Sequence, residues 1–336
     1  MTGFNRGEWS ELLAILSLIS SPNLKIVDEN LRFVCDDIFK IVQIIKPVLP
    51  VDKPEFVTSE ISKDLYWDIV TAPTGEGSFS IKSEEKECNE LLEALKTKSN
   101  AQNKADVIAD VEDLTKNSIE NVSYSIKSML GSPATLLNAS SATNFEYIVH
   151  GITKQQAEEI NNITTRTKLK DRLDAIEKLG GNIAFSKIPN STFEGNLLMI
   201  DSLMPEILGN VLIESYRGNT KDLLELFTAS PHFRSRQHAV KKLNDLLQAI
   251  SFGMFPNKVW DGTFEVNGGI LIVKPTGDVG LLDLIYHNDI VSKFLTKETK
   301  LDSPSSTRYH MLELEPIDDS ESAFKFTLNL QIRYKH

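Results

Sequence analysis

Cysteine and histidine are scarce in this chain of 336 residues, which contains two Cys and six His. Cys35 and Cys88 are too far apart in sequence for a CxxC metal-binding motif and too few for a disulfide framework, so we expect buried free thiols. The histidines include no i,i+4 pair and no cluster with cysteine. A zinc site is therefore not expected.

Several common functional motifs are also missing. The chain has no P-loop, no G-x-G-x-x-G and no G-x-S-x-G, which argues against NTPases, dinucleotide-binding enzymes and serine hydrolases. No apolar run has the length of a membrane span, and charge and polar breaks interrupt the N-terminal MTGFNRGEW, unlike a signal peptide. We therefore expect a cytoplasmic protein.

A basic excess is absent, because 36 Lys and Arg face 47 Asp and Glu, for a formal net charge of −11. This balance argues against a non-specific nucleic-acid coat, which depends on neutralising phosphates. It permits an enzyme with a local basic cleft, in which acidic residues serve as metal ligands. With 41% hydrophobic and 25% charged residues, the composition is that of a globular protein with room for two domains.

The stretch 104–145 combines a predicted hairpin with the charges of a catalytic site. Residues 105–111 and 122–126 alternate apolar and polar side chains, as strands do, around the polar insert 115–121. Folding about Lys116 and Asn117 places Asp106 level with Lys127. A carboxylate and an ammonium on neighbouring strands can hold a divalent metal and stabilise charge at a phosphate, which is the geometry of the PD-(D/E)xK nucleases.

Another stretch, earlier in the chain, has the same pattern. Residues 65–83 are a second hairpin candidate, with Gly75 and Gly77 in the turn. Folding this stretch back on itself about Gly75 places Asp68 level with Lys82. The tetrapeptide Ser-Ile-Lys-Ser occurs in both hairpins, at 80–83 and 125–128. The residue pattern alone does not choose between them.

An amphipathic helix is predicted over residues 6–19 by apolar residues at helical spacing, with Asn5 as its cap. Glu8 and Glu11 lie three apart on one face of it. Two interpretations remain open: the two carboxylates simply solvate this face, or Glu11 reaches a metal held by Asp106.

Two polar loops and one basic segment are candidate DNA contacts. The first loop, PATLLNASSATNF, offers Thr135, Asn138, Ser140 and Asn144, and the second, TKLDSPSSTRYH, offers Ser306, Thr307, Arg308 and His310. The most basic segment, residues 231–254, is a candidate phosphate-contacting helix start. Ordinary turns, surface ion pairs and a solvated helix face are the alternative interpretations.

Several stretches together resemble one family, the HpaII-type type II restriction endonucleases. They are, in order along the chain, GEWSE, SYSIKSMLGSPATLLNASSATNF, SFGMFPNKVWDG, NGGILIVK, TKLDSPSSTRYH and TLNLQIRY. The resemblance implies a Mg²⁺-dependent enzyme of the PD-(D/E)xK class that hydrolyses duplex DNA at a short palindrome, CCGG in the type member. It also implies that the two polar loops read the DNA.

The resemblance falls on the later of the two hairpins and so favours Lys127 over Lys82. By hairpin pairing, Asp106 is then the first carboxylate, with Asp110 as the fallback. Ser125 stands at the catalytic position where the second acid of (D/E)xK is expected, and a ligand must come from elsewhere. Glu11 is the expected donor, with Glu8 behind it.

The resulting hypothesis is that Asp106, Glu11 and the main-chain carbonyl of Ile126 hold Mg²⁺, while Lys127 orients the attacking water. The expected fold is mixed α+β, a restriction-endonuclease-like α/β core with a mixed central sheet flanked by helices, extended by a helical and β-rich C-terminal part. We expect residues 1–150 to form the nuclease core and 151–336 to serve DNA recognition and dimerisation.

A palindromic site also implies a homodimer on DNA and a cognate DNA methyltransferase in the same system. Two alternatives stay open at this point. One is a catalytically inactive DNA-binding protein of the same fold, favoured by Ser125, and the other is a structure-selective repair nuclease.

Overall fold

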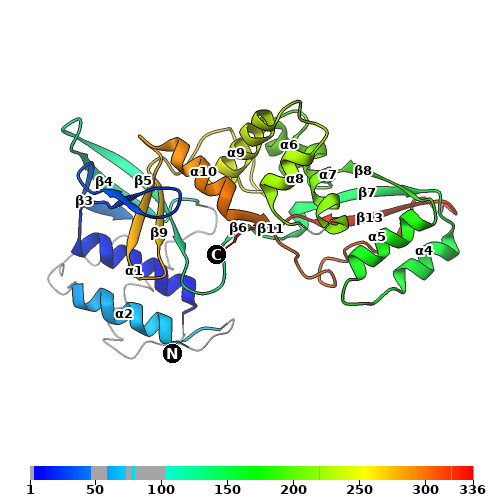
Figure 1. Ribbon diagram of the computed structural model, residues 1–336, viewed down its shortest axis with the longest axis horizontal. Helices are drawn as coiled ribbons and strands as arrows, with labels where there is room; N and C mark the ends of the chain where they lie inside the picture. The colour runs from blue at the N-terminus through cyan, green and yellow to red at the C-terminus, as the bar shows by residue number, and fades with distance from the viewer. Residues whose placement is uncertain are drawn as a thin grey trace. The chain divides into compact units, whose positions relative to one another are not determined.

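The computed structural model describes residues 4–46, 59–72, 77–79, 103–218, 220–318 and 320–335. The chain divides into two compact units (Figure 1). The first unit comprises Met1–Ala134, Phe264–Leu295 and His336, and the second comprises Thr135–Thr263 and Thr296–Lys335.

A mixed sheet of seven strands forms the centre of the first unit, in the order β2-β1-β10-β9-β5-β4-β3. Its strands are β1 (Ile26–Val27), β2 (Phe33–Cys35), β3 (Phe39–Lys46), β4 (Val107–Asp113), β5 (Ser118–Ser128), β9 (Gly269–Val273) and β10 (Val279–Asp283). The parallel pairs are β5 with β9 and β1 with β10, and the other neighbours are antiparallel. The expected mixed sheet flanked by helices is confirmed.

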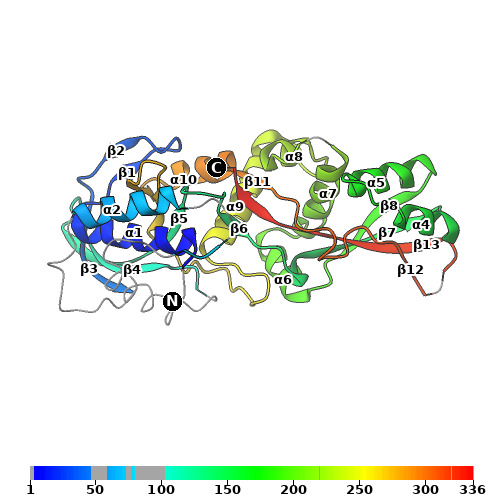
Figure 2. The same cartoon turned by 90° about the horizontal axis from the view of Figure 1, so that it is seen from below.

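Helix α1 (Arg6–Ser20) packs against β5 and β9 of this sheet, beside α2 (Ser59–Thr71), as Figures 1 and 2 show. The predicted cap is confirmed, because Asn5 and Glu8 form a capping box. Apolar residues along α1, including the fully buried Trp9, meet the core-facing side chains Val107 and Tyr124 of the hairpin. The unit therefore holds α1 firmly against the strands of the predicted site.

The hairpin expected over residues 65–83 is wrong in its first half. Residues 59–71 form α2, in which Leu65 and Ile69 are buried four residues apart and pack against the core of α1. Helical burial at i,i+4 thus outweighs the β-propensity of the Ile69-Val70 pair. Asp68 lies on this helix, and Lys82 lies outside the described residues.

The second unit contains two smaller sheets and most of the helices. One sheet has the order β11-β14-β6 and the other β12-β13-β7-β8, in which β7 pairs with β13 from Asn144↔Asn329 to His150↔Ala323. The strands are β6 (Thr135–Leu137), β7 (Asn144–His150), β8 (Asn182–Lys187), β11 (Thr299–Leu301), β12 (Glu315–Pro316), β13 (Ala323–Asn329) and β14 (Ile332–Tyr334).

Helices of the second unit pack against strands of both sheets. The helices of this unit are α4 (Lys154–Asn161), α5 (Lys168–Lys178), α6 (Ser191–Ile200), α7 (Met204–Arg217), α8 (Leu223–Ala229) and α9 (Arg236–Phe252), with a 3₁₀ turn η2 (Ser141–Thr143). Tyr147 on β7 is fully buried, stacks on Phe326 and donates a hydrogen bond to the carbonyl of Gly209 at 2.7 Å. Helix α10 (Asn288–Glu298) contains the boundary between the units at Leu295.

The compact units do not follow the expected division at residue 150. The chain leaves the first unit at Ala134, and residues 264–295 return to it because β9 and β10 complete its sheet. A pairing between β5 and β9 across about 145 residues of sequence has no local signal. The assignment of recognition and dimerisation to the C-terminal part stays a prediction.

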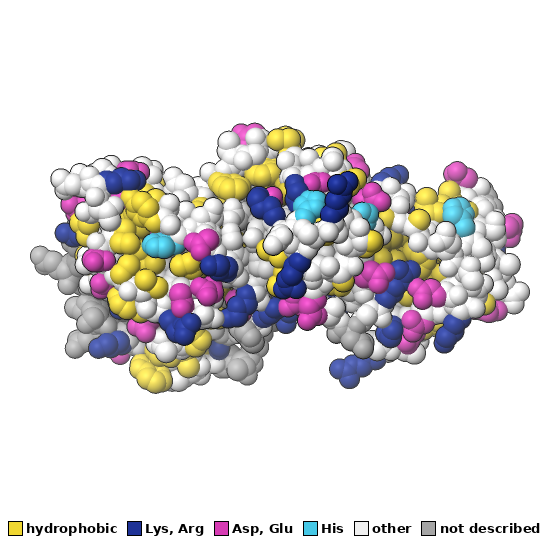
Figure 3. Space-filling model, turned by 45° about the horizontal axis from the view of Figure 1, so that its top comes forward, with side chains coloured by type: hydrophobic (Ala, Val, Ile, Leu, Met, Phe, Trp, Pro, Cys, Tyr) yellow, Lys and Arg dark blue, Asp and Glu magenta, His cyan; other side chains and the backbone are white. Residues whose placement is uncertain are grey.

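Charge is distributed unevenly between the units. The second unit has 20 of the 36 Lys and Arg residues and 21 of the 47 acidic residues, so it contributes −1 to the formal charge of −11. Lys, Arg and His side chains gather on the face of this unit in the middle of Figure 3. The overall acidity of the chain therefore says little about this unit as a DNA-binding surface.

Cys35 is a free thiol but is half-buried rather than buried, and Cys88 lies outside the described residues. Within the described ranges, no single helix has the length and hydropathy of a membrane span, although α6 and α7 meet that test together, with a bend of 104° between them.

Candidate active site

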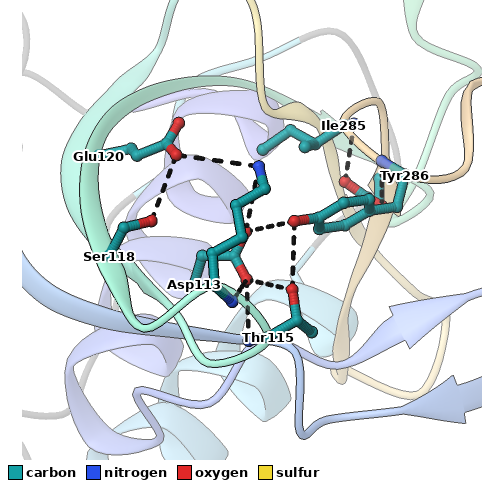
Figure 4. Close-up of polar contacts among 8 residues, drawn as sticks. Asp113, Thr115, Ser118, Glu120, Ile285 and Tyr286 are labelled. Atoms are coloured by element: carbon teal, nitrogen blue, oxygen red, sulfur yellow. Dashed lines mark hydrogen bonds and ion pairs between the residues drawn. The ribbon is translucent and has the colours of Figure 1, made fainter.

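The predicted hairpin forms, but its register differs from the expected one by two residues. Strand β4 pairs with β5 from Val107↔Tyr124 to Asp113↔Ser118, so the position of Asp106 is level with Ser125 and not with Lys127. The reason is the buried Asp113, whose Oδ1 accepts hydrogen bonds from the backbone of Thr115 and Lys116 (Figure 4). This Asx-type turn starts at Asp113, before the polar insert from which the register was predicted.

Asp106 still lies beside the predicted catalytic lysine. Its backbone N–H donates to the carbonyl of Tyr124 at 2.9 Å, and its Oδ2 accepts from the N–H of Ile126 at 2.7 Å. The carboxylate is therefore fixed against β5 next to the residue that precedes Lys127. Diagonal neighbours across an antiparallel pair remain within reach of long side chains, so the two-residue shift does not separate the pair.

Lys127 is half-buried near the end of β5, and its Nζ donates to the carbonyl oxygen of Ile126 at 3.0 Å. The ammonium and the carbonyl predicted to bind metal thus lie together. Ser125 is buried, with 2% of its surface exposed, and lies level with Ile270 of the parallel strand β9. A serine in this position supplies no ionised oxygen.

Glu11 is brought to the same place by α1. Burial of this half-buried side chain, followed by the negative charge of Asp106, raises the pKa of Glu11 to about 7, while the charge of Lys127 acts in the opposite direction. Glu11 therefore shares its electrostatic environment with both residues of the hairpin. The structure brings together the three side chains on which the predicted site depends.

The two fallback acids occupy other places. The Glu8 carboxylate accepts a hydrogen bond from the backbone N–H of Asn5 at 2.7 Å and completes the cap of α1, although its charge also acts on Glu11. Asp110 lies level with Asn121, whose side-chain amide donates to it at 3.3 Å. This arrangement favours Glu11 and Asp106 as the acids of the site.

Two charged residues of this cluster were missed by sequence reasoning. The half-buried Lys104 donates its backbone N–H to Glu265 at 2.8 Å, and burial together with the charge of Lys127 lowers the pKa of Lys104 to about 8, against the opposing charges of Glu265 and Asp106. Lys104 precedes Asp106 by two residues and could have been considered. Glu265 had no local signal, because the pairing of β5 with β9 brings it here.

The set of residues fits a divalent cation. Within the part of the chain that the structure describes, no group of three or more His, Cys, Asp or Glu side chains is placed to hold a metal. The predicted set needs two carboxylates, Asp106 and Glu11, and one carbonyl, that of Ile126. Burial and the charge of Asp106 both disfavour ionised Glu11, and a divalent cation held by hard oxygen ligands would offset this cost.

The two predicted DNA-contacting loops lie against each other in the second unit. The hydroxyl of Tyr309 in the second loop donates to the carbonyl of Ala139 in the first at 2.9 Å. Asn138 is exposed, whereas Thr135, on β6 and level with Arg333, is half-buried. Two segments separated by about 170 residues are therefore joined by a hydrogen bond.

Within the second loop, Thr307, Arg308 and His310 are exposed and Ser306 is half-buried. The Arg308 guanidinium lies over the ring of Tyr309 at 5.4 Å, and His310 has a φ of 46° and contacts Glu313 at 3.1 Å. A backbone in this left-handed region is typical of a tight turn.

Two of the predicted DNA contacts have structural partners. The side-chain amide of Asn329 donates to the carbonyl of Ser140 and to Oδ1 of Asn144, each at 2.6 Å. These bonds fix the base of the first loop to β13, so turn formation accounts for Ser140 and Asn144. Asn138, Thr307, Arg308 and His310 remain the exposed side chains of the predicted contacts in the two loops.

Comparison with known proteins gives one family. The model of the family described as HpaII restriction endonuclease matches residues 50–334. The type II restriction enzyme HpaII of Haemophilus parainfluenzae is 28% identical over 369 residues, covering 98% of each chain. No solved structure matches the chain significantly.

Proposed function

This chain belongs to the HpaII restriction endonuclease family, and from that premise we propose that it cuts duplex DNA at CCGG with Mg²⁺ as cofactor. Members of the family are type II restriction endonucleases, which are site-specific deoxyribonucleases. The sequence CCGG is the one that the resemblance to the type member implies. Mg²⁺ is the hard divalent cation that carboxylate and carbonyl oxygens favour in phosphoryl-transfer sites.

The observation that supports this proposal most is that α1 packs against β5 and brings Glu11 within electrostatic range of Asp106 and Lys127. Ser125 leaves the site one carboxylate short, and α1 supplies another from a residue about a hundred positions away. A protein of this fold that only bound DNA would have no need for two carboxylates and an ammonium in one half-buried place. The composition of the site therefore supports catalysis over binding alone.

Each side chain has a defined role in the proposed reaction. Asp106 and Glu11, with the Ile126 carbonyl, would hold Mg²⁺, which when bound supplies Lewis-acid stabilisation of charge on the phosphate. The hydrogen bond from Ile126 N–H holds the Asp106 carboxylate in place. Lys127 presents an ammonium that orients the attacking water and stabilises negative charge developing on the phosphate oxygens.

The hydrolysis itself forms one bond and breaks another. The water oxygen bonds to phosphorus while the bond from phosphorus to the 3′ oxygen breaks, in line. The water loses a proton, and the departing 3′ oxygen gains one and leaves as a hydroxyl. The products are a 5′-phosphate and a 3′-hydroxyl at each cut.

The palindromic target implies the partners. One active site cuts one strand at a time, so two copies on a two-fold axis would cut both strands of CCGG. We propose a homodimer on DNA, a cognate methyltransferase that protects the same sequence, and action in the cytoplasm, where incoming DNA is met. Sedimentation with and without a CCGG duplex distinguishes a dimer from sequential nicking by monomers.

Digestion of a sequenced plasmid tests the function. Discrete fragments with ends at CCGG, formed with Mg²⁺ and abolished by EDTA, are the expected result. Discrete fragments with other ends would support a restriction enzyme but contradict CCGG as its recognition sequence. Cutting without discrete bands would favour the structure-selective nuclease, and a gel shift without cutting would favour the inactive binder.

A further inference from the structure

A group of basic residues gathers at the start of α9 (Arg236–Phe252). We call Arg234, Arg236, His238, Lys241 and Lys242 the α9 basic patch. No acidic residue occurs between Glu225 and Asp245, although the chain as a whole has an excess of 11 acids. The second unit, which contains the patch, contributes one of these negative charges.

The members of the patch differ in their partners. Lys241 forms an ion pair with Asp245 on the same helix, and Lys242 pairs with Asp201 at 2.7 Å. Arg234 and Arg236 are exposed, and no carboxylate of the described residues lies within ion-pair distance of either. The two guanidinium groups are therefore free to meet an anion from solution, and they are not neutralised by the fold.

The backbone that carries these two arginines is fixed. Ser235 caps α9 by accepting from the N–H of His238 at 3.2 Å. The ring of Phe233 stacks on Phe227 of α8 at 5.8 Å, and the side chain of His232 is hydrogen-bonded to Asn210 of α7 at 2.8 Å. Three elements thus hold residues 232–238, so the guanidinium groups project from a defined surface rather than from a loose loop.

We propose that the α9 basic patch binds phosphates of duplex DNA outside the recognised sequence. This inference rests on the proposed action on duplex DNA and adds a surface that the two predicted reading loops do not contain. Arg is suited to this role because its planar guanidinium can donate two parallel hydrogen bonds to one phosphate. Such contacts carry no base specificity and increase affinity for any sequence.

The position of α9 supports this partner. Helix α9 packs against β6, the strand that contains Thr135 and leads into the first reading loop. Lys and Arg side chains lie beside His on the face of the second unit seen in Figure 3. A duplex held by the reading loops would extend beyond its four central base pairs, so flanking phosphates would be available to a basic surface of the same unit.

The test is binding to a duplex without CCGG, measured in EDTA as a function of salt. The variant is Arg234→Gln with Arg236→Gln, which removes two charges and keeps long polar side chains. Loss of two phosphate contacts should lower the slope of log affinity against log salt by about 2, and weaken binding roughly tenfold near physiological salt. With cleavable DNA, KM should rise while kcat at saturating DNA stays unchanged.

The matched control is Lys154→Gln with Arg166→Gln in the same unit. Lys154 is the first residue of α4, as Arg236 is of α9, and both control residues are exposed. This control makes the same change in net charge away from the patch and should leave the salt slope unaltered. A second variant, Arg234→Lys with Arg236→Lys, keeps the charge and should retain most of the affinity.

Several results would overturn the inference. An unchanged salt slope in the Gln variant excludes phosphate contacts at the patch, and an equal loss in the control assigns the effect to net charge. A fall in kcat at saturating DNA would assign the arginines to the structure of the enzyme instead. The binding assay uses neither CCGG nor metal, so its result does not depend on cleavage. A wild-type protein that cuts at another sequence, or does not cut, would contradict the proposed function and would leave the test of the patch unaffected.

Discussion

The Asp106 carboxylate accepts a hydrogen bond from the backbone N–H of Ile126 at 2.7 Å. Together with the bond from the Asp106 N–H to the Tyr124 carbonyl, it joins the residue before β4 to the strand that carries Lys127. The predicted first acid is thus fixed without the level pairing that the hairpin pattern predicted. The Ile126 carbonyl accepts from Lys127 Nζ, so one residue of β5 contacts both members of the pair. The relationship suggests which changes should damage cleavage and which should not.

Replacing Lys127 by Ala should abolish cutting while leaving DNA binding intact. The ammonium is assigned to the attacking water and to charge on the phosphate, and loss of one such group typically lowers kcat by about 10²–10³ or more. The measurements are single-turnover cleavage and a gel shift with the same CCGG duplex. Lys116→Ala is the matched control, because Lys116 lies at the turn end of the same hairpin and its side chain is half-exposed.

Cleavage at the wild-type rate by the Lys127 variant would contradict the assignment of this residue. A Lys127→Ala protein that neither cuts nor binds would indicate a structural role for the lysine, which a thermal unfolding curve would reveal.

Stability without metal should fall as the pH rises through the ionisation of Glu11. The unfolded carboxyl ionises near 4.5, and the pKa of folded Glu11 is raised to about 7. Between these values the folded protein holds the proton more tightly, so the free energy of unfolding decreases as the pH rises from 4.5 to 7 and the loss is complete above 7. After allowance for partial exposure, the loss is roughly 1–3 kcal/mol.

Thermal unfolding in EDTA between pH 5 and 8 measures this effect, with Glu11→Gln as the comparison. The Glu11→Gln variant should not show the loss of stability that ionisation of Glu11 causes, and it should be more stable than the wild type at pH 8. If both proteins lose the same stability over this range, Glu11 is not in the environment described above.

Asp113 should matter for stability and not for chemistry. Burial alone would raise the pKa of the Asp113 carboxylate. Hydrogen bonds from Thr115, from the hydroxyl of Tyr286 at 2.5 Å and from the backbone of Lys116 outweigh this effect and hold the pKa well below its usual range. Asp113→Ala leaves buried donors without an acceptor and should cost about 2–4 kcal/mol.

Denaturant unfolding at pH 7 measures this cost, and Asp110→Ala on the same strand is the control. Because the folded pKa is depressed, the Asp113 contribution is present above pH 4 and is lost as the pH falls below the unfolded value. Folded Asp113→Ala protein should still cut, since the turn lies at the far end of the hairpin from Asp106. A fall in cleavage rate larger than the fall in the fraction of folded protein would contradict a role for Asp113 in stability alone.

The fold and the site were predictable to different degrees, for physical reasons. Strand periodicity and the N-terminal cap are local, so the hairpin and α1 were found from the sequence. The register was missed because Asp113 starts the turn through its own side chain. Residues 65–71 were assigned to a strand because packing of Leu65 and Ile69 against α1, which has no local signature, decides their conformation.

Non-local pairing explains the remaining difference. Glu265 reaches the site through the parallel pairing of β5 with β9, and Tyr309 reaches Ala139 across two loops. Neither contact has a signature in the residues around it. The proximity of Glu11 to Asp106 was expected from the missing acid at Ser125, which is an argument from chemistry rather than from pattern.

Tyr309→Phe should weaken recognition of the specific site more than binding to other DNA. The change removes the hydrogen bond to the Ala139 carbonyl that joins the two reading loops. The loss of one such bond is worth about 0.5–1.5 kcal/mol, or roughly three- to tenfold in affinity for a CCGG duplex. Competition binding measures the specificity ratio, which is the affinity for a CCGG duplex divided by the affinity for a duplex without CCGG.

The control for this variant is Tyr66→Phe, which removes a similar bond from a tyrosine hydroxyl to the Pro275 carbonyl in the first unit. Its specificity ratio should equal that of the wild type. An unchanged ratio in Tyr309→Phe would show that the loops read DNA independently or not at all.

In the proposed site, α1 supplies the acid that β5 lacks, and the decisive measurement is the Mg²⁺ dependence of cleavage by Glu11→Gln. At saturating CCGG duplex, this variant should need far more Mg²⁺ for half-maximal rate and should cut at least about a hundredfold more slowly. Glu120→Gln, an exposed glutamate on β5, should behave as the wild type. An unchanged rate and Mg²⁺ requirement in Glu11→Gln would contradict the role of Glu11 as the acid supplied by α1.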